Sequence, residues 1–337
     1  AVHSGDGEGC EFVRSRIHPS TVSACGENRR NYTPTHPVAL SLIRTSGEDG
    51  GMKIATVRVD GGTRAVRIDG DEAVDLGYDD VGALLASGGA GSAGGAAGIG
   101  GVIAGGAAGA EPRRWPVADL EWERLILAPS KVLCVGLNYR GHIAEMGREF
   151  PNYPTLFMKF TDALTGANDD IAHPQEVEEL DWEAELVVVI GKDVRRASTA
   201  EAEDAIAGFT VLNDVSARDW QHRTLQWLQG KNWDSSTPVG PLMVTPDEVG
   251  GVRPALRITT TVDGEVMQDS TTGDLLFDPV ELVQYASTII RLRPGDMIAT
   301  GTPAGVGAGM TPPRFLKPGQ TVACAIEGIG TTRNRIV

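Results

Sequence analysis

Two glutamates, Glu183 and Glu185, stand two positions apart at the start of the apolar run Leu186–Ile190. Side chains two apart on a strand point to the same face, so both carboxylates can reach one point. Asp214 follows a second apolar run, Phe209–Leu212. Three carboxylates around one point repel each other unless a cation neutralises them, and oxygen ligands suit Mg²⁺ first and Mn²⁺ or Ca²⁺ next. The spacing predicts a metal site, with a solvated acidic strand face as the alternative.

A histidine and a glutamate lie three residues apart earlier in the chain, at His142 and Glu145. If this segment is helical, the two side chains meet on one face. A carboxylate beside an imidazole fixes the tautomer of the ring and raises its basicity, which suits a base that activates water. The pair predicts acid–base chemistry, with a solvated surface pair as the alternative.

Three further polar residues are candidates to act beside the carboxylates. Lys231 stands in a Gly-Lys-Asn-Trp segment, and a lysine desolvated near an anionic site can stabilise an enolate or carbanion. Arg218 and Gln221 follow Asp214 closely enough to share its loop or the helix after it. Each is uninformative alone, so the interest of each depends on the residues it accompanies.

Short apolar runs separated by Gly, Pro and Asp must position these side chains. Runs of this length favour strands over helices. The expected strands are Lys131–Val135, Leu186–Ile190, Phe209–Leu212, Leu256–Val262, Met297–Thr300 and Thr321–Ile326. Helices are expected over Ala200–Ala207, with Ser198 and Thr199 as caps, and over Pro279–Ile290. The sequence predicts a β-rich α+β fold.

The segment before these runs predicts a small N-terminal β element. The runs Ile54–Val59 and Ala65–Ile68 flank Asp60-Gly61-Gly62, and glycine accepts the positive φ of a hairpin turn. The glycines of Ala86–Ala110 match neither nucleotide-binding fingerprint, so we expect a flexible insertion. We predict that residues 1–51 form a disordered extension and that the folded protein begins near Met52. Residues 52–125 are predicted to form the small β element, including the insertion, and residues 126–337 the catalytic domain.

The composition argues against some classes of partner. The chain of 337 residues has a formal net charge of −15, which repels phosphate backbones and anionic lipid, and its Lys and Arg form no basic patch. No run approaches the ~20 apolar residues of a membrane-spanning helix. The 4 cysteines show no CxxC spacing, and nothing at the N-terminus has the order of a secretory signal. We expect a cytoplasmic protein with reduced thiols and neither a nucleic-acid nor a membrane partner.

The order and spacing of several motifs resemble those of the fumarylacetoacetate hydrolase family. The resemblance covers about Lys131 to Val337. The motifs are Asn138-Tyr139 with His142-x-x-Glu145, Asp181-Trp182-Glu183-Ala184-Glu185, Asn213-Asp214 through Gln221, Gly230-Lys231, Pro294-Gly295-Asp296 and Thr300-Gly301-Thr302-Pro303. One departure is Phe160, which follows Lys159 where many relatives have proline, and it weakens any inference about the pocket wall.

The resemblance implies a twisted β-roll catalytic fold, usually a homodimer, that binds Mg²⁺ or Mn²⁺ through Glu183, Glu185 and Asp214. It also implies roles for the other candidates. These are water activation by His142 and Glu145 on a mobile lid, stabilisation of developing negative charge by Lys231, and substrate contact by Arg218, Gln221 and Thr302.

The activity that the resemblance implies is hydrolytic cleavage of a C–C bond in an acylpyruvate-type 2-oxo acid, of the kind found in aromatic catabolism. Water activated by His142 and Glu145 would attack the distal carbonyl, and pyruvate would leave as its enolate. Oxaloacetate decarboxylation, and isomerisation or hydration of an unsaturated 2-oxo diacid, pass through the same enolate and remain alternatives. A non-catalytic protein that binds a metal or ligand on the same fold is the alternative of another class.

Overall fold

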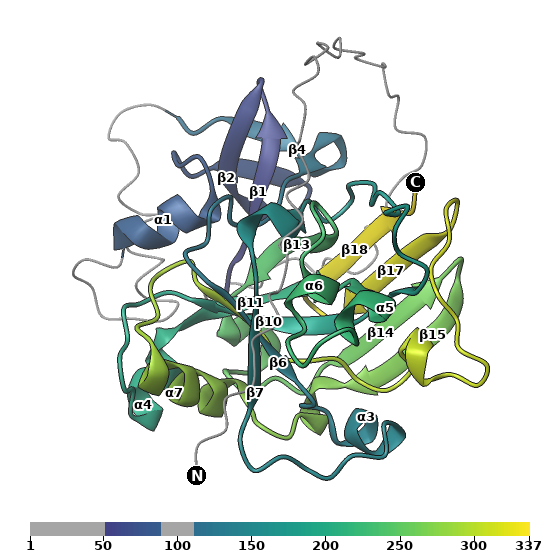
Figure 1. Cartoon of the computed structure of the whole chain (residues 1–337). Coiled ribbons are helices and arrows are strands. Elements are labelled where there is room, and N and C mark those ends of the chain that lie inside the picture. The colour runs from purple at the N-terminus through teal and green to yellow at the C-terminus, as the bar shows by residue number, and fades with distance from the viewer. Residues whose placement is uncertain (1–50, 89–110) are drawn as a thin grey trace, which may run out of the picture. The chain divides into compact units, whose positions relative to one another are not determined.

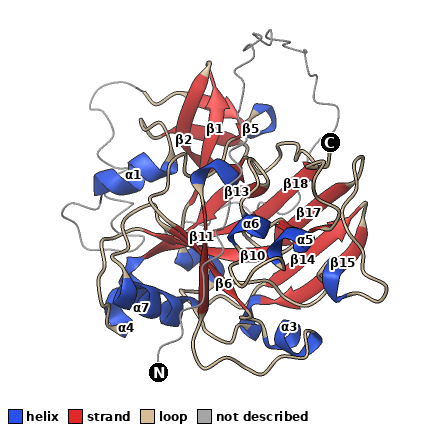
Figure 2. Cartoon of the chain, in the orientation of Figure 1, coloured by secondary structure: helices blue, strands red, loops and turns tan. Residues whose placement is uncertain are grey.

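The structure is a computed structural model that describes residues 51–88 and 111–337 (Figure 1). Strands make up more of these residues than helices do, which confirms the predicted β-rich α+β class (Figure 2). The predicted extension lies outside the described residues except for Gly51. Most of the predicted glycine-rich insertion lies outside them too, and its first residues, 86–88, end helix α1 (Val81–Gly88).

A mixed sheet of 12 strands runs through the chain. Its order is β4 (Arg114–Pro116), β3 (Glu72–Asp75), β2 (Gly62–Asp69), β1 (Lys53–Val59), β13 (Thr237–Val244), β11 (Ile206–Asn213), β10 (Ala184–Ile190), β16 (Met297–Ala299), β6 (Val132–Gly136) and β7 (Thr155–Lys159), with β5 (Glu121–Trp122) on β1 and β8 (Leu164–Thr165) on β13. The pairs β16–β6 and β13–β8 are parallel, and the other pairs are antiparallel. Long-range pairing therefore joins segments from both ends of the described chain.

Two smaller sheets and several short helices complete the described fold. The sheet of 4 strands has the order β15 (Glu265–Thr271), β14 (Arg257–Val262), β17 (Thr321–Ile326) and β18 (Gly330–Arg335), and the other pairs β12 (Ser216–Ala217) with β9 (Leu180–Asp181). The remaining α-helices are α3 (Arg140–Glu145), α4 (Thr199–Ala205), α5 (Arg218–Gln221), α6 (Leu228–Lys231) and α7 (Pro279–Ile289). The 3-10 turns are η2 (Val117–Asp119), η3 (Thr161–Ala163), η4 (Pro246–Val249), η5 (Thr272–Asp274) and η6 (Gly307–Gly309).

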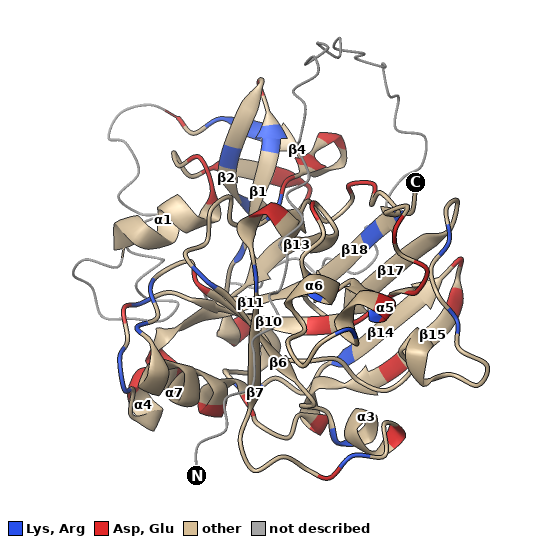
Figure 3. Cartoon of the chain, viewed as in Figure 1, with Lys and Arg blue, Asp and Glu red and all other residues tan. Residues whose placement is uncertain are grey.

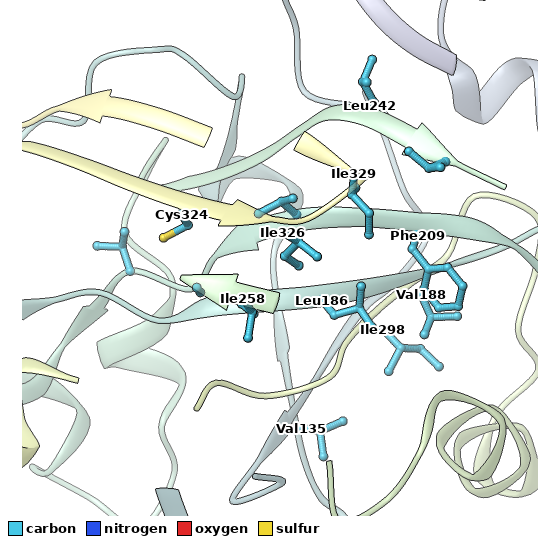
Figure 4. Close-up of a cluster of buried hydrophobic side chains, with 14 of the residues drawn as sticks. Val135, Leu186, Val188, Phe209, Leu242, Ile258, Ile298, Cys324, Ile326 and Ile329 are labelled. Atoms are coloured by element: carbon cyan, nitrogen blue, oxygen red, sulfur yellow. The ribbon is translucent and has the colours of Figure 1, made fainter. Parts of the chain in front are cut away.

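Strand β10 is buried along its whole length and separates two apolar clusters. Leu186 and Val188 belong to the cluster that includes side chains of the 4-stranded sheet (Figure 4). Val187 and Val189 belong to the other cluster, which includes residues of α1. The alternation follows from the two-residue period of a strand. Glu183 and Glu185 continue the odd-numbered series, which is how the predicted pair comes to share a face.

The predicted N-terminal hairpin is confirmed as β1 and β2. Its turn has positive φ at Asp60 (53°) and at Gly61 (76°), which is the geometry of a two-residue hairpin loop. The other edge of β1 pairs with β13 through Lys53↔Val244 and the two residues that follow it. The strands of the N-terminal element therefore continue the sheet that carries β10 and β11.

The two helices expected from sequence are present, each one residue shorter than expected, with α7 ending at Ile289 and not at Ile290. Ser198 caps α4 in a capping box with Glu201, as the predicted cap requires. The helix ends at Ala205, so the expected end at Ala207 is wrong, because Ile206 already pairs with Ile190 as the first residue of β11. A β-branched residue with a partner strand at hand favours the sheet over another helical turn.

Candidate metal centre

Three carboxylates meet where β10 begins and β11 ends. The register sets Ala184 opposite Asn213, so Glu183 and Asp214, one residue beyond each, become neighbours. Asp214 N donates to the carbonyl oxygen of Glu183 at 2.8 Å, and Glu183 N donates to Asn213 Oδ1 at 3.0 Å. One oxygen from each of Glu183, Glu185 and Asp214 lies within 4.8 Å of the others, and all three residues are buried. The predicted convergence of the three is confirmed.

Three buried cations contact two of these carboxylates. Lys231 Nζ lies 2.7 Å from Glu183 Oε2 and 2.9 Å from Asp214 Oδ2. Arg218 Nη1 lies 2.7 Å from Glu183 Oε1, and Lys159 Nζ lies 2.5 Å from Asp214 Oδ1. Acidic and basic segments accordingly adjoin near α5, α6 and the start of β10 (Figure 3). Burial raises the pKa of Glu183, but the charges of Lys231 and Arg218 outweigh burial and lower this pKa to about 2.

Glu185 is the carboxylate of the three without a cationic partner among the described residues. Its Oε2 accepts a hydrogen bond from Gly301 N at 2.7 Å. Burial, and then the negative charges of Asp214 and Glu183, raise the pKa of Glu185 well above its usual value. A buried carboxylate with like charges beside it is costly unless a cation neutralises it. The donor set of three carboxylates therefore fits a divalent metal ion.

Gly301 must be a glycine for this hydrogen bond to form. Its φ is +97°, a value that side-chain-bearing residues rarely adopt. A Cβ atom there would lie 2.9 Å from the carbonyl oxygen of Val135. The backbone that follows β16 can approach Glu185 only because this position carries no side chain.

His142 and Glu145 form the predicted pair on helix α3. His142 Nδ1 lies 3.0 Å from Glu145 Oε2, and Glu145 Oε1 accepts from Gly305 N at 3.0 Å. Burial raises the pKa of Glu145, but the hydrogen bonds from His142 and Gly305 lower it by more, so the carboxyl group is ionised. Helix α3 buries His142 and leaves Glu145 exposed, so the pair is partly open to solvent.

The three predicted substrate-contacting residues are buried around the carboxylates. Arg218 Nη1 donates to Gln221 Oε1 at 3.0 Å, while Arg218 Nη2 is buried with no hydrogen-bond partner among the described residues. Thr302 Oγ1 accepts from Gln268 Nε2 at 2.8 Å, and Gln268 Oε1 accepts from Ala184 N at 3.1 Å. Thr302 is thus linked to the start of β10 through Gln268, a residue that the sequence analysis did not single out.

Asp181 was also missed as a functional candidate, although it opens the Asp-Trp-Glu-Ala-Glu motif. Its Oδ1 accepts from Trp182 N at 2.8 Å and Gly307 N at 2.7 Å. Its Oδ2 accepts from Ala308 N at 3.0 Å and Arg218 Nε at 2.8 Å. Asp181 therefore holds the loop before β17 and the guanidinium group that contacts Glu183. Its position at the head of the motif was the signal that could have found it.

Lys159 was noted only as the neighbour of Phe160. Nothing in the sequence links the last residue of an apolar run to Asp214, which lies 55 positions away. The ammonium group of Lys159 also donates to the carbonyl oxygen of Lys231. Its participation follows from the order of strands in the sheet and could not be derived from spacing.

This fold and this carboxylate cluster define a class of protein. The family description "Fumarylacetoacetate (FAA) hydrolase C-terminal" matches residues 131–337, and the chain belongs to this family. The predicted resemblance and the catalytic fold that it implied are therefore confirmed.

Two relatives of this chain are named as oxaloacetate tautomerases. An oxaloacetate tautomerase (FAHD2A, mitochondrial) of Bos taurus is 44% identical over 224 residues, covering 66% of this chain and 71% of that protein. The human FAHD2A oxaloacetate tautomerase is 42% identical over the same shares of the two chains.

Solved structures agree over a larger part of the chain. A putative HpcE protein from Mycobacterium smegmatis has a TM-score of 0.74 at 32% identity, covering 85% of this chain and 99% of that one. Fumarylacetoacetate hydrolase from Exiguobacterium antarcticum has a TM-score of 0.72 at 31% identity, with the same coverage. A 2-hydroxyhepta-2,4-diene-1,7-dioate isomerase from Mycobacterium marinum has a TM-score of 0.66 at 33% identity, covering 85% and 98%.

The structure also bears on the expectations about cysteines and membrane-spanning helices. Cys134 and Cys324 are buried free thiols, as expected, and the other cysteines lie outside the described residues. No helix in the described part of the chain is long and apolar enough to cross a membrane. The homodimer, the cytoplasmic location and the domain limits stay predictions.

Proposed function

We propose that this chain is a divalent-metal-dependent enzyme that interconverts the keto and enol forms of a small 2-oxo diacid, with oxaloacetate as the first substrate to test. The observation that carries the proposal is the buried carboxylate cluster, in which Glu185 has no cationic partner among the described residues. Relatives named as oxaloacetate tautomerases and a structure named as a dioate isomerase support this reaction class. Oxygen donors favour Mg²⁺ or Mn²⁺ and then Ca²⁺.

A keto–enol exchange breaks a C–H bond beside the ketone and forms an O–H bond, so it needs no co-reactant. A bound metal ion would polarise the ketone oxygen and stabilise enolate charge. His142 is the proposed base. Because Glu145 is ionised, it accepts the Nδ1–H of His142 and leaves Nε2 free to take the proton from carbon and return it.

Lys231 is proposed to stabilise negative charge on the substrate oxygen. Burial lowers the pKa of Lys231, but the charges of Asp214 and Glu183 outweigh burial and raise it. The side chain is therefore an ammonium ion at neutral pH and cannot serve as the base. A fixed positive charge in a buried site stabilises a developing oxyanion more than the same charge in water does.

Arg218 is proposed to bind a carboxylate of the substrate. Its Nη2 is the group of this guanidinium that lacks a partner in the described part of the chain, while its other nitrogens contact Asp181, Glu183 and Gln221. A planar guanidinium that is already fixed on two sides binds a carboxylate with little further loss of entropy. Gln221 and Thr302 are the proposed hydrogen-bonding neighbours.

Hydrolytic cleavage of an acylpyruvate is the second candidate. The His142–Glu145 pair favours it, because such a pair can also activate water, and a structural neighbour is named fumarylacetoacetate hydrolase. Water would add to the distal carbonyl, the C–C bond would break, and the enolate of pyruvate would leave and take up a proton. Two further reactions would pass through the same enolate, and their products should also be monitored. They are the decarboxylation of oxaloacetate and the hydration or isomerisation of an unsaturated 2-oxo diacid.

The test is a panel of oxaloacetate, acetylpyruvate and fumarylpyruvate with Mg²⁺ or with EDTA. The enol absorbance of oxaloacetate reports tautomerisation, and chromatography reports pyruvate. We expect Mg²⁺-dependent tautomerisation that is lost in Glu185→Gln and His142→Gln. Acylpyruvate cleavage without tautomerisation would establish the second candidate, and no Mg²⁺-dependent turnover would contradict both and favour a non-catalytic binding protein.

A further inference from the structure

Glu183, Glu185 and Asp214 each have one carboxylate oxygen that accepts from its own donor. Each of these donors contacts one of the three carboxylates and not the other two. Lys231 differs, because it contacts both Glu183 and Asp214. The three single-carboxylate contacts are Arg218 Nη1 to Glu183 Oε1 at 2.7 Å, Gly301 N to Glu185 Oε2 at 2.7 Å, and Lys159 Nζ to Asp214 Oδ1 at 2.5 Å.

Of the two cationic donors, Lys159 is more deeply buried than Arg218. Lys159 ends β7, where it pairs with Val132 of β6, and it is 1% exposed. Its ammonium group is held between Asp214 Oδ1 and the carbonyl oxygen of Lys231. A buried ammonium ion must keep its acceptors, because a lost partner is not replaced by water. Oδ1 of Asp214 is therefore committed to Lys159, and Oδ2 is the oxygen on the side of Glu183 and Lys231.

Building on the metal centre proposed above, we infer that Lys159 is a positioning residue that restricts Asp214 to one metal-binding oxygen and so favours Mg²⁺ or Mn²⁺ over Ca²⁺. Three single oxygens suit a small octahedral ion, which keeps its other positions for water and substrate. Ca²⁺ takes roughly six to eight oxygens at longer distances and gains from carboxylates that bind through both oxygens. Releasing Oδ1 of Asp214 would make such binding available.

The test compares the Kd values of the full chain for Ca²⁺ and Mn²⁺ in wild type and in Lys159→Met, measured by calorimetry. Removing the positive charge of Lys159 should strengthen the binding of Ca²⁺ and Mn²⁺ by similar factors, because both ions carry two charges. This electrostatic effect therefore cancels in the ratio of the two Kd values. We expect the ratio of the Ca²⁺ Kd to the Mn²⁺ Kd to fall about tenfold, the lower end of the effect of removing a residue that orients a metal ligand.

Lys131→Met is the matched control. Lys131 Nζ lies 2.6 Å from Asp296 Oδ2, so the variant loses a lysine–aspartate pair that contacts none of the three carboxylates. We expect the wild-type Kd ratio in this variant. A wild-type ratio in Lys159→Met as well would overturn the inference while leaving the metal centre intact.

Two results keep the inference separate from the proposed function. Absence of Mn²⁺ binding by the wild-type chain would overturn both. If Lys159→Met fails to fold, the electron spin-echo spectrum of wild-type chain with Mn²⁺ in ¹⁷O-labelled water decides. About three water ligands are expected beside three single carboxylate oxygens, and fewer would overturn the inference.

Discussion

Two clusters of charged side chains differ in how completely their carboxylates are paired. The first, called here the N-terminal cluster, consists of Arg58, Glu123 and Asp169. Arg58 Nε contacts Glu123 Oε2 at 2.8 Å, and Arg58 Nη1 and Nη2 each contact one oxygen of Asp169 at 2.7 Å. Thr165 Oγ1 and Gly166 N also donate to Asp169 at 2.8 Å. In the carboxylate cluster, Glu185 receives one backbone hydrogen bond and no cation from the described residues.

The difference separates a cluster that neutralises its own charges from one that we propose to bind a metal ion. The N-terminal cluster is half-buried and complete, so its hydrogen bonds contribute to stability and its carboxylates need no further partner. The carboxylate cluster is more deeply buried and has a carboxyl group that its own residues do not neutralise. A buried carboxyl group without a neutralising partner lowers the stability of the fold unless a bound ligand offsets this cost. Such destabilising arrangements are common at sites that bind ions.

The largest effect should come from removing the unpaired carboxylate. Glu185→Gln should lower metal-dependent turnover about 1000-fold, because the metal contributes several kcal/mol to transition-state stabilisation and each 1.4 kcal/mol is roughly tenfold in rate. In EDTA, its melting temperature should equal or exceed that of wild type, since a costly buried carboxyl group is gone. Glu123→Gln is the control and should keep wild-type turnover. Equal losses of activity in both variants would erase the distinction.

The next effect tests whether the His142–Glu145 pair works on the substrate and not on the metal. His142→Gln should lower kcat about 100-fold, the lower end for loss of a general base. Its Kd for Mn²⁺ should stay near that of wild type. His173→Gln is the control, because His173 Nδ1 contacts the carbonyl oxygen of Pro174 and no residue of the carboxylate cluster. A Mn²⁺ affinity that falls together with kcat would move His142 into the metal site.

Metal should stabilise the fold through one cluster and not through the other. At Mn²⁺ concentrations of about 100 times Kd, the free energy of unfolding of wild type should rise by about 2.7 kcal/mol. Asp169→Asn should show the same increase, and Glu185→Gln should show little. Urea unfolding with and without Mn²⁺ measures it, and a full increase in Glu185→Gln would contradict the assignment.

The smallest effect concerns the complete cluster and its dependence on pH. Burial raises the pKa of Asp169, but hydrogen bonds from Arg58 and Thr165 lower it below 3.8. A depressed folded-state pKa stabilises the protein above the unfolded-state pKa, and this contribution is lost as the pH falls through the folded-state pKa. Asp169→Asn should therefore lose about 1 kcal/mol at pH 7 and less at pH 3. Urea unfolding at both pH values measures it, and a larger deficit at pH 3 would contradict the sign.

Local patterns predicted most of the elements but not their assembly. The apolar runs at Leu186–Ile190 and Thr321–Ile326 are strands, and the Asp60-Gly61 turn closes a hairpin. These features depend on neighbouring residues, which a sequence displays. The pairing of β1 with β13 joins residues nearly two hundred positions apart, and such a pairing leaves no local signal.

The candidate site was predictable where its residues share an element. Glu183 and Glu185 follow from strand alternation, and His142 with Glu145 follows from helical spacing. That Asp214 faces Glu183 depends on the register of β10 with β11, which the sequence left open and the family resemblance supplied. Lys159 and Gln268 reach the site from other strands, so neither spacing nor motif indicated them.

The pairing of β1 with β13 also sets a lower limit on how much of the chain can be expressed alone. The family match begins at residue 131, after β1, so a fragment cut at that point would keep β13 without the partner of Leu242–Val244. An apolar strand with unpaired backbone groups recruits strands from other molecules. We therefore expect a fragment limited to residues 131–337 to aggregate more readily than the full chain, because it lacks the strand that covers this edge of β13.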